Sequence, residues 1–215
     1  MQCKYKIFPI TILSLILLNA CSAGIINLED AKSNVEKYYT DGTYEKELDV
    51  IIEDAIHKIP EVNPGNKETV IFDVDETTLS NFEYAKSMSY GYDLITWKEW
   101  VNKSKAPAIK QVKRFYDVLV NKGFIIIFLS GRNESEYAAT EKNLINAGYK
   151  NFDTLIVRNS IELNYTTAKY KYRKRKELAD RGYNIIYCVG DQESDFWNGY
   201  TGTIIKLPNY LYKME

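Results

Sequence analysis

Apolar residues recur with helical spacing over the first part of the chain, from residue 28 to residue 59. The pair Asp41-Gly42 divides this stretch into two groups of apolar positions. Residues 60–66, which contain two prolines and a glycine, are typical of a loop. The pattern therefore predicts an N-terminal helical segment over residues 28–66, made of two helices and a closing loop.

Beyond residue 66, short apolar runs alternate with amphipathic stretches. The expected strands are 70–74, 124–129, 155–157, 185–189 and 203–207. Helical spacing covers 108–120, 134–147 and 170–181. Continuous apolar strands separated by amphipathic helices indicate a parallel sheet covered on both faces. We therefore predict an α/β fold with a Rossmann-like parallel sheet over residues 67–215.

An aromatic-rich segment over residues 80–106 interrupts this alternation. It lies in the crossover after the first expected strand, where open α/β sheets bind ligands. A small helical cap over such a site is the natural interpretation. The alternative is a satellite hydrophobic cluster without a ligand role. The aromatic residues are Phe82, Tyr84, Tyr90, Tyr92, Trp97 and Trp100.

The extreme N-terminus has the pattern of an export signal. Lys4 and Lys6 precede a short apolar run that ends in Leu18-Asn19-Ala20-Cys21. This is similar to a bacterial lipoprotein signal, in which the cysteine receives the lipid. We predict a signal peptide over residues 1–20, lipidation at Cys21 and a lipid-anchored tether over residues 21–27. The expected location is the bacterial cell envelope, at the outer membrane or cell surface. An ordinary signal peptide and an uncleaved anchor are the alternatives.

Composition excludes several classes of protein. The formal net charge of −1 over 215 residues provides no field that favours a nucleic acid polymer. The single histidine, His57, lies in an acidic helical stretch and is expected to be a surface or packing residue. Once Cys3 is cleaved off and Cys21 lipidated, only Cys188 remains, so no intramolecular disulfide can form. A cysteine-based phosphatase is excluded, because Ser194 stands where its phosphate loop would need arginine.

Two pairs of carboxylates lie at the ends of expected strands. Asp73 and Asp75 close the first strand, and their spacing of two points both side chains the same way. Asp191 and Asp195 follow the run over 185–189. Carboxylates packed this closely repel each other and need a cation. Oxygen ligands suit a hard divalent ion such as Mg²⁺. The two pairs together predict an oxygen-rich metal site at the carboxyl ends of two parallel strands.

Two further segments suit a phosphate group. Ser130 and Gly131 follow the run over 124–129, where a hydroxyl and an N–H could bind phosphate oxygens. A plain turn capped by Ser130 is the alternative. Six of the eight residues over 169–176 are cationic. Most of them must face solvent, and this pattern does not say which ones function.

The order of these motifs resembles the haloacid dehalogenase superfamily from about residue 33 to the end. More narrowly, it is similar to class C acid phosphatases of the lipoprotein e type (subfamily IIIB) and to plant vegetative-storage acid phosphatases. Gln192-Glu193 replaces the Asn-Leu that is usual in bacterial members, and Tyr210 stands where plant members often have proline. The segments that carry the resemblance are Asp73–Asn81 with Tyr84, Trp97 with Trp100, Gly190–Asp195 and Lys206–Asn209.

The resemblance implies a role for each acidic residue. Asp73 is expected to be the nucleophile that forms an aspartyl-phosphate. Asp75 would protonate the leaving oxygen and then activate water, and its backbone carbonyl would reach Mg²⁺. Asp191 and Asp195 would complete the magnesium site, Asp195 directly or through water. An acid that must begin protonated is consistent with an acidic rate optimum.

The resemblance also implies how the phosphate and the rest of the substrate are held. Ser130, Gly131 and Lys171 would bind phosphoryl oxygens, with Lys169 as the alternative lysine. Thr77 would belong to the same phosphate-binding set and orient the loop after the first strand. Substrate contacts in the cap are expected from Asn81, Tyr84 and Trp97.

We therefore expect an exported Mg²⁺-dependent acid phosphatase. Its substrates would be small phosphate monoesters, with 5′-nucleotides or nicotinamide mononucleotide as candidates. A non-catalytic storage-type binding protein on the same fold and a phosphotransferase are the alternatives. Association into a homodimer is left open.

Overall fold

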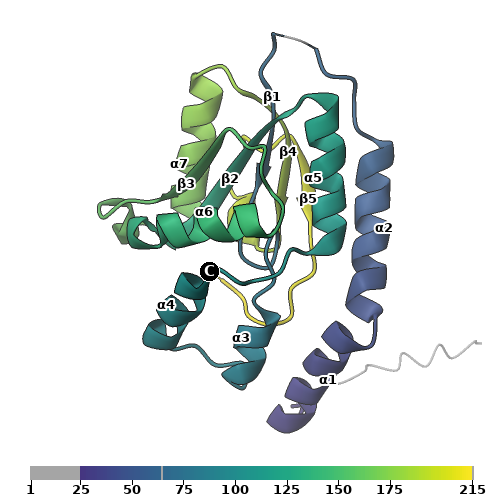
Figure 1. Cartoon of the computed structure of the whole chain (residues 1–215), viewed down its shortest axis with the longest axis vertical. Helices are drawn as coiled ribbons and strands as arrows, with labels where there is room; N and C mark the ends of the chain where they lie inside the picture. The colour runs from purple at the N-terminus through teal and green to yellow at the C-terminus, as the bar shows by residue number, and fades with distance from the viewer. Residues whose placement is uncertain (1–24, 64, 215) are drawn as a thin grey trace, which may run out of the picture.

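The computed structural model describes residues 25–63 and 65–214. Its centre is a sheet of parallel strands in the order β3-β2-β1-β4-β5 (Figure 1). The α/β class and the parallel sheet expected from the sequence are confirmed. The strands are β1 (Glu68–Phe72), β2 (Ile125–Asn133), β3 (Thr154–Arg158), β4 (Asn184–Gly190) and β5 (Thr203–Lys206).

Alternate residues of β1 face the two sides of the sheet, as the pleat of a strand requires. Val70 and Phe72 belong to a core shared with α2 (Thr43–His57) and α5 (Lys110–Lys122). Ile71 belongs to a smaller core with α7 (Thr167–Asp180). Because β1 is buried on both faces, its run of apolar residues is continuous rather than alternating.

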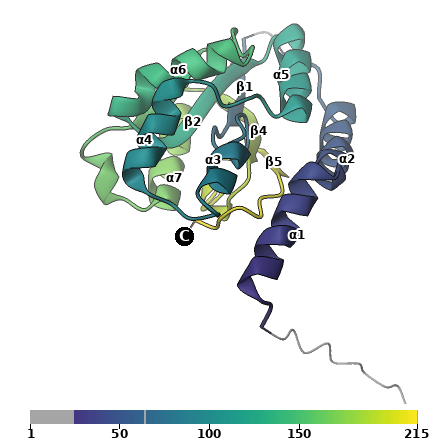
Figure 2. The ribbon, with the colours of Figure 1, turned by 60° about the horizontal axis from the view of Figure 1, so that its bottom comes forward.

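The N-terminal helices are α1 (Leu28–Thr40) and α2, and Asp41-Gly42 separates them as expected. Gly42 has a φ of +87°, a left-handed conformation that glycine adopts without strain. The Asn27 side chain caps α1 by accepting a hydrogen bond from the Glu29 N–H. Helix α2 packs on the sheet beside α5, whereas α1 extends away from it (Figures 1 and 2).

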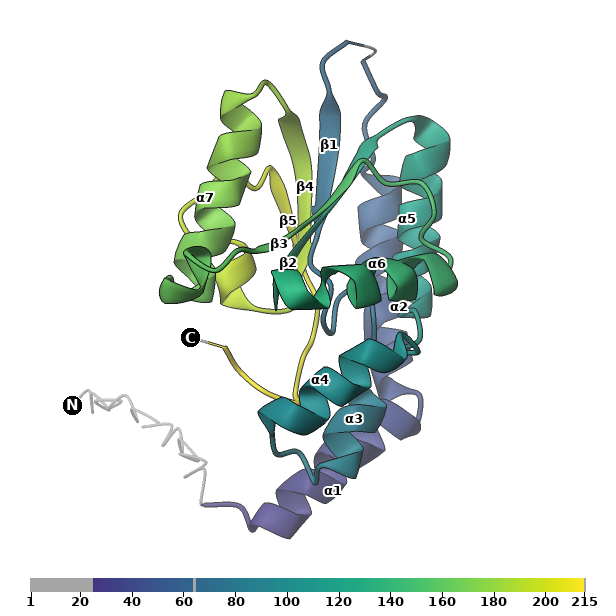
Figure 3. The same ribbon diagram turned by 60° about the vertical axis from the view of Figure 1, so that its left-hand side comes forward.

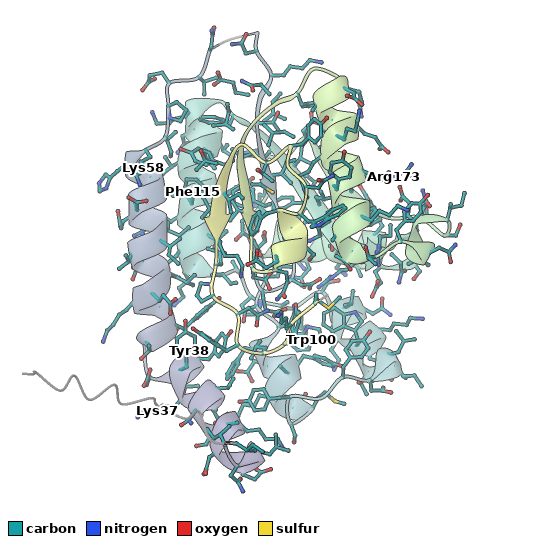
Figure 4. The ribbon with its side chains drawn as sticks, turned by 180° about the vertical axis from the view of Figure 1, so that it is seen from behind. Lys37, Tyr38, Lys58, Trp100, Phe115 and Arg173 are labelled. Carbon is teal, nitrogen blue, oxygen red and sulfur yellow. The ribbon has the colours of Figure 1, made fainter. Side chains whose placement is uncertain are left out.

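Three segments lie at the carboxyl ends of the strands (Figure 3). Two are the cap helices α3 (Phe82–Ser87) and α4 (Leu94–Lys103), both within the expected cap over 80–106. The third is the C-terminal segment, residues 207–214. Trp100 of α4 donates an indole hydrogen bond to Asn81 Oδ1 at 2.8 Å, where the cap meets the core (Figure 4).

Element boundaries differ from the expected ones mainly in β2. The strand continues through Ser130 and Gly131 to Asn133, and the 3₁₀ turn Glu134–Glu136 precedes α6 (Tyr137–Asn146). No helix therefore begins directly after Gly131. His57 is exposed at the end of α2, and Cys188 is buried.

The proposed signal peptide over residues 1–20 and the lipidation residue Cys21 lie outside the described residues. Over residues 25–63 and 65–214, none of the helices has the length and apolar character needed to span a bilayer.

Candidate active site

A cavity of about 530 Å³ opens at the carboxyl ends of the strands. Residues of the cap and of the C-terminal segment line it. Both segments lie at the carboxyl ends of the strands (Figure 3). Both Asp73 and Asp75 line it, together with Asp191, Asp195 and Lys171. The structure therefore brings into one cavity the residues of both expected carboxylate pairs.

Three of these carboxylates form a compact group. Each of Asp73, Asp191 and Asp195 offers an oxygen within 4.8 Å of the others, and all three residues are buried. Hard divalent cations prefer such oxygen donors, and a buried acidic cluster gains most from neutralisation. The residues therefore fit a divalent metal ion.

Surrounding polar groups orient the Asp191 carboxylate. Its Oδ1 accepts a hydrogen bond from the Thr77 hydroxyl at 3.0 Å, and its Oδ2 accepts from the side chains of Gln192 (2.6 Å) and Asn209 (2.7 Å). These bonds hold the carboxylate in one orientation, as partners of metal ligands commonly do. Thr77 is not among the residues that line the cavity, so it contacts a candidate metal ligand rather than the cavity itself.

The Asp195 side chain packs against Gly190, the last residue of β4. A Cβ atom at Gly190 would overlap the Asp195 carboxylate, so only glycine fits at this position. The Gln192 N–H donates to Asp195 Oδ2 at 2.9 Å. Glycine at the end of β4 therefore lets the turn fold back and place Asp195 beside Asp73.

Lys171 points into the acidic cluster from α7. Its Nζ contacts Asp73 Oδ1 and lies 2.5 Å from Asp195 Oδ1. The alternative lysine, Lys169, is exposed and lies over the Tyr165 ring. Of the two lysines that the sequence left open, Lys171 is therefore the one at the acidic cluster.

Arg175 lies one helical turn after Lys171 and contacts the main chain of the same loop. Its guanidinium donates to the carbonyls of Asp195 (2.5 Å), Trp197 (2.5 Å) and Gly199 (3.1 Å), and the residue is fully buried. Two cations on one face of α7 therefore bind the Asp195 loop. Lys171 contacts the Asp195 carboxylate, and Arg175 contacts the backbone carbonyls of the loop.

Replacing Arg175 with lysine should weaken divalent metal binding about 10- to 100-fold, the usual effect of losing a partner that orients a ligand. A lysine cannot reach three separate carbonyls, so the Asp195 loop would lose its fixed position. Calorimetric titration of the metal-free protein with Mg²⁺ measures the change. Arg173→Lys is the matched control, because Arg173 points outward from α7 (Figure 4). Equal affinities in the two variants would contradict the prediction.

Asp75 does not join the acidic triad. Its carboxylate accepts hydrogen bonds from Arg132 Nη2 at 2.6 Å and Nε at 3.1 Å, and from Asn81 Nδ2 at 2.8 Å. The Arg132 guanidinium also lies 5.4 Å from the centre of the Trp97 ring. Arg132 therefore links the candidate acid–base residue to the cap.

Glu76 is a buried carboxyl that the sequence did not single out. Its backbone φ is +55°, and its carboxyl accepts hydrogen bonds from the Asn81 N–H (2.8 Å) and the Tyr212 hydroxyl (2.5 Å). Burial raises the pKa of Glu76 to about 8, and the neighbouring carboxylates of Asp75 and Asp191 add to this effect. Glu76 thereby ties the loop after β1 to the C-terminal segment.

The buried carboxyl groups should make the metal-free protein less stable as pH rises from 4.5 to about 8. In this interval folded Glu76 keeps a proton that the unfolded chain has released, so rising pH favours the unfolded chain. Burial raises the pKa of Asp73 and of Asp191 as well, which acts in the same direction. Urea unfolding at a series of pH values measures the trend. Glu76→Gln should reduce the slope, and an unchanged slope would contradict this assignment.

The expected phosphate and substrate residues fall into two groups. Gly131 and the cap residues Asn81, Tyr84 and Trp97 line the cavity. Ser130 is fully buried and is not among the lining residues; its hydroxyl accepts a hydrogen bond from the Arg132 N–H at 3.1 Å. The continuation of β2 past Gly131 accounts for this placement, because it keeps Ser130 within the sheet.

The cap aromatics contact each other and the core. Tyr84 and Trp97 meet edge to face with ring centres 5.3 Å apart. The Trp97 indole N–H donates to the buried Glu136 carboxylate at 3.1 Å, which fixes the ring at the cavity wall. These contacts give the aromatic rings a structural role and also place two of them beside the cavity.

The C-terminal segment forms a wall of the cavity that sequence reasoning missed. Leu211, Tyr212 and Met214 line it. The Met214 N–H donates to Gln192 Oε1 at 2.9 Å, and the Tyr210 N–H donates to the Tyr39 hydroxyl at 3.1 Å. Only the Lys206–Asn209 motif drew attention to this region, because no apolar periodicity marks the residues after it.

Comparison with known proteins gives a family match over most of the chain. The model described as HAD superfamily, subfamily IIIB (acid phosphatase), matches residues 19–215. The chain is 42% identical over 161 residues to the stem 28 kDa glycoprotein of Glycine max, which covers 72% of this chain and 63% of that protein. It is 32% identical over 190 residues to acid phosphatase 1 of Solanum lycopersicum, covering 86% of this chain and 74% of that protein.

A solved structure has the same fold. The class C acid phosphatase from Bacillus anthracis superposes with a TM-score of 0.71 and 23% sequence identity, covering 87% of each chain. At this identity the likeness concerns the fold. The chain spans 63% and 53% of the lengths of the two Glycine max glycoproteins that it matches at 42% identity.

Proposed function

The chain belongs to the acid phosphatases of subfamily IIIB in the haloacid dehalogenase superfamily, and from this premise we propose that it is an exported, Mg²⁺-dependent phosphomonoesterase. The observation that carries the proposal is the buried group of Asp73, Asp191 and Asp195 with Lys171 in contact with it. Three acids and a lysine at the carboxyl ends of parallel strands suit phosphoryl transfer, in which catalysis consists largely of positioning and charge neutralisation.

Asp73 is the proposed nucleophile. One of its carboxylate oxygens attacks phosphorus, the bond from phosphorus to the ester oxygen breaks, and an aspartyl-phosphate remains. Water then attacks the same phosphorus, which releases inorganic phosphate and restores the Asp73 carboxylate. The Thr78 hydroxyl donates to the Asp73 carbonyl at 2.5 Å and so holds this residue at the end of β1.

Charge neutralisation makes the attack of one anion on another possible. Lys171 lies against Asp73 and would contact the phosphoryl oxygens together with the Gly131 N–H. Asp73, Asp191 and Asp195 would hold Mg²⁺, with the Asp75 carbonyl as a further ligand, and the ion would supply positive charge to the transferring group.

Asp75 is the proposed acid and base. It gives a proton to the departing ester oxygen and later takes one from the attacking water. In the described structure Arg132 binds this carboxylate. For Asp75 to act, substrate would have to draw Arg132 away from it and toward the phosphoryl group. Because the departing ester oxygen needs a proton from Asp75, we expect the rate to be highest at acidic pH.

The proposed substrates are small phosphate monoesters, with 5′-nucleotides and nicotinamide mononucleotide as candidates. The cavity volume of about 530 Å³ is within the range for small-molecule sites. Tyr84 and Trp97 offer ring faces and edges on which a base could pack.

Hydrolysis of a panel of phosphomonoesters with Mg²⁺ and with chelator, from acidic to neutral pH, tests the proposal. We expect turnover that requires the metal and is fastest at acidic pH. Adding an alcohol acceptor and analysing products separates hydrolysis from phosphotransfer. Binding without turnover of any ester, with Mg²⁺ present, would favour the storage-type alternative and overturn the proposed activity.

Export and attachment to a membrane form a separate part of the proposal, supported by the sequence pattern that ends at Cys21. We expect Cys21→Ser to release the protein from the membrane fraction and to leave hydrolysis of a phosphomonoester unchanged. Cell fractionation with an activity assay measures both. A variant that stays in the membrane fraction would contradict lipidation at this cysteine.

A further inference from the structure

Arg158 ends β3 and lines the cavity. It pairs in register with Asn133, the last residue of β2, so it lies at the side of the cavity away from β4. Strands β1 and β3 are both neighbours of β2, which sets their backbones about 10 Å apart. A group held by Arg158 would therefore lie to one side of a phosphate held at Asp73.

Arg158 differs from the other cations of the cavity in its charge balance. Lys171 is paired with Asp73 and Asp195, and Arg132 is paired with Asp75. Among the described residues, Arg158 has no carboxylate within ion-pair distance.

The acid nearest to Arg158 in the sequence is already engaged. Glu162, on the loop that follows β3, forms an ion pair with Lys174 at 2.6 Å. Its carboxylate also accepts a hydrogen bond from the Asn159 N–H at 3.1 Å. Glu162 therefore forms its ion pair with Lys174 and lies beyond ion-pair distance of Arg158, although its charge still acts on the Arg158 guanidinium.

The contacts that Arg158 does make leave part of its guanidinium unused. Nη2 donates to the Tyr165 carbonyl at 2.6 Å, and the guanidinium lies 5.1 Å from the centre of the Tyr170 ring. Nε is buried and has no hydrogen-bond partner among the described residues. A partly buried cation without an ion-pair partner is costly, and an incoming anion would relieve that cost.

We propose that Arg158 binds a second anionic group, a carboxylate or a second phosphate, on the substrate whose phosphomonoester lies at Asp73. This rests on the proposed phosphatase function and narrows it to substrates that carry a second negative charge several atoms from the phosphate. The Tyr170 ring and the Tyr165 carbonyl orient the guanidinium, which makes Arg158 a residue that determines specificity.

A series of phosphooxy-carboxylates with increasing carbon chain, each paired with its neutral carboxamide, tests the proposal. At one chain length the carboxylate ester should have a KM about tenfold or more below that of the matching carboxamide ester. A hydrogen bond to a charged group provides a free energy of this size. Arg158→Gln should remove this preference and leave the KM of the carboxamide unchanged. Arg158→Lys should restore part of it.

Arg173→Gln is the matched control, because Arg173 also contacts the Tyr165 side chain but is exposed. It should leave the preference intact. The proposal is overturned if no chain length shows a preference for the carboxylate, or if that preference survives in Arg158→Gln. It is also overturned if Arg158→Gln raises the KM of both esters equally, because this result indicates a structural role only.

Equilibrium binding separates this proposal from the proposed function. Both esters are titrated into the Asp73→Asn protein, with and without Arg158→Gln, so that affinities are measured without turnover. A preference for the carboxylate that depends on Arg158 supports the anion site even if the wild type hydrolyses neither ester. Hydrolysis of the carboxamide ester with no such preference overturns the anion site and leaves the phosphatase function standing.

Discussion

Asp73→Asn should lower kcat by at least about 10⁴-fold, the scale on which covalent enzymes depend on their nucleophile. An amide oxygen is a poor nucleophile, and the other carboxylate beside Lys171, that of Asp195, would be bound to the metal ion. Steady-state hydrolysis of a good phosphomonoester substrate with saturating Mg²⁺ measures the loss. Retention of substantial activity would exclude Asp73 as the residue that accepts the phosphoryl group.

The same variant also separates loss of chemistry from loss of fold. Burial and the neighbouring carboxylates raise the pKa of Asp73, so a neutral amide at this position removes the cost of burying a negative charge beside Asp191 and Asp195. We expect metal-free Asp73→Asn to be at least as stable as the wild type near neutral pH, as measured by thermal unfolding. An inactive and unfolded variant would leave Asp73 as a structural residue and contradict this assignment.

The fold could be predicted because its signals are local and repeated. The apolar strands, the amphipathic helices and the break at Asp41-Gly42 each follow from residues that are neighbours in the sequence. The sequence could also predict that Asp73, Asp191 and Asp195 lie close together, because parallel strands place their carboxyl ends at one edge of the sheet.

The supporting residues could not be predicted in the same way, because their partners are distant in sequence and are often backbone groups. Arg175 looked like one cation among six, and only its burial against the carbonyls of the Asp195 loop distinguishes it. Glu76 meets Tyr212 across 136 positions of sequence. Asp75 was expected to point the same way as Asp73 at the end of the first strand, yet Arg132 and Asn81 bind its carboxylate apart from the acidic triad.

Lys171→Met should lower kcat/KM about 10²- to 10³-fold, the effect of removing one group that stabilises charge in the transition state. It should also destabilise the metal-free protein by about 3–5 kcal/mol at neutral pH, because removing one partner leaves buried carboxylates without a counter-charge. Lys171 is buried between Asp73 and Asp195, and methionine keeps its length without its charge. Enzyme kinetics and urea unfolding measure the two effects.

Bound Mg²⁺ and acidic pH should each reduce the stability loss without restoring the rate. The ion supplies positive charge to the same carboxylates and stabilises the folded state by mass action. Protonation of Asp73 and Asp191, whose pKa values burial raises, removes the repulsion at low pH. Lys169→Met is the matched control and should change neither property, because Lys169 is exposed on the same helix. If the control loses activity as Lys171→Met does, the phosphate-binding lysine has been assigned to the wrong residue.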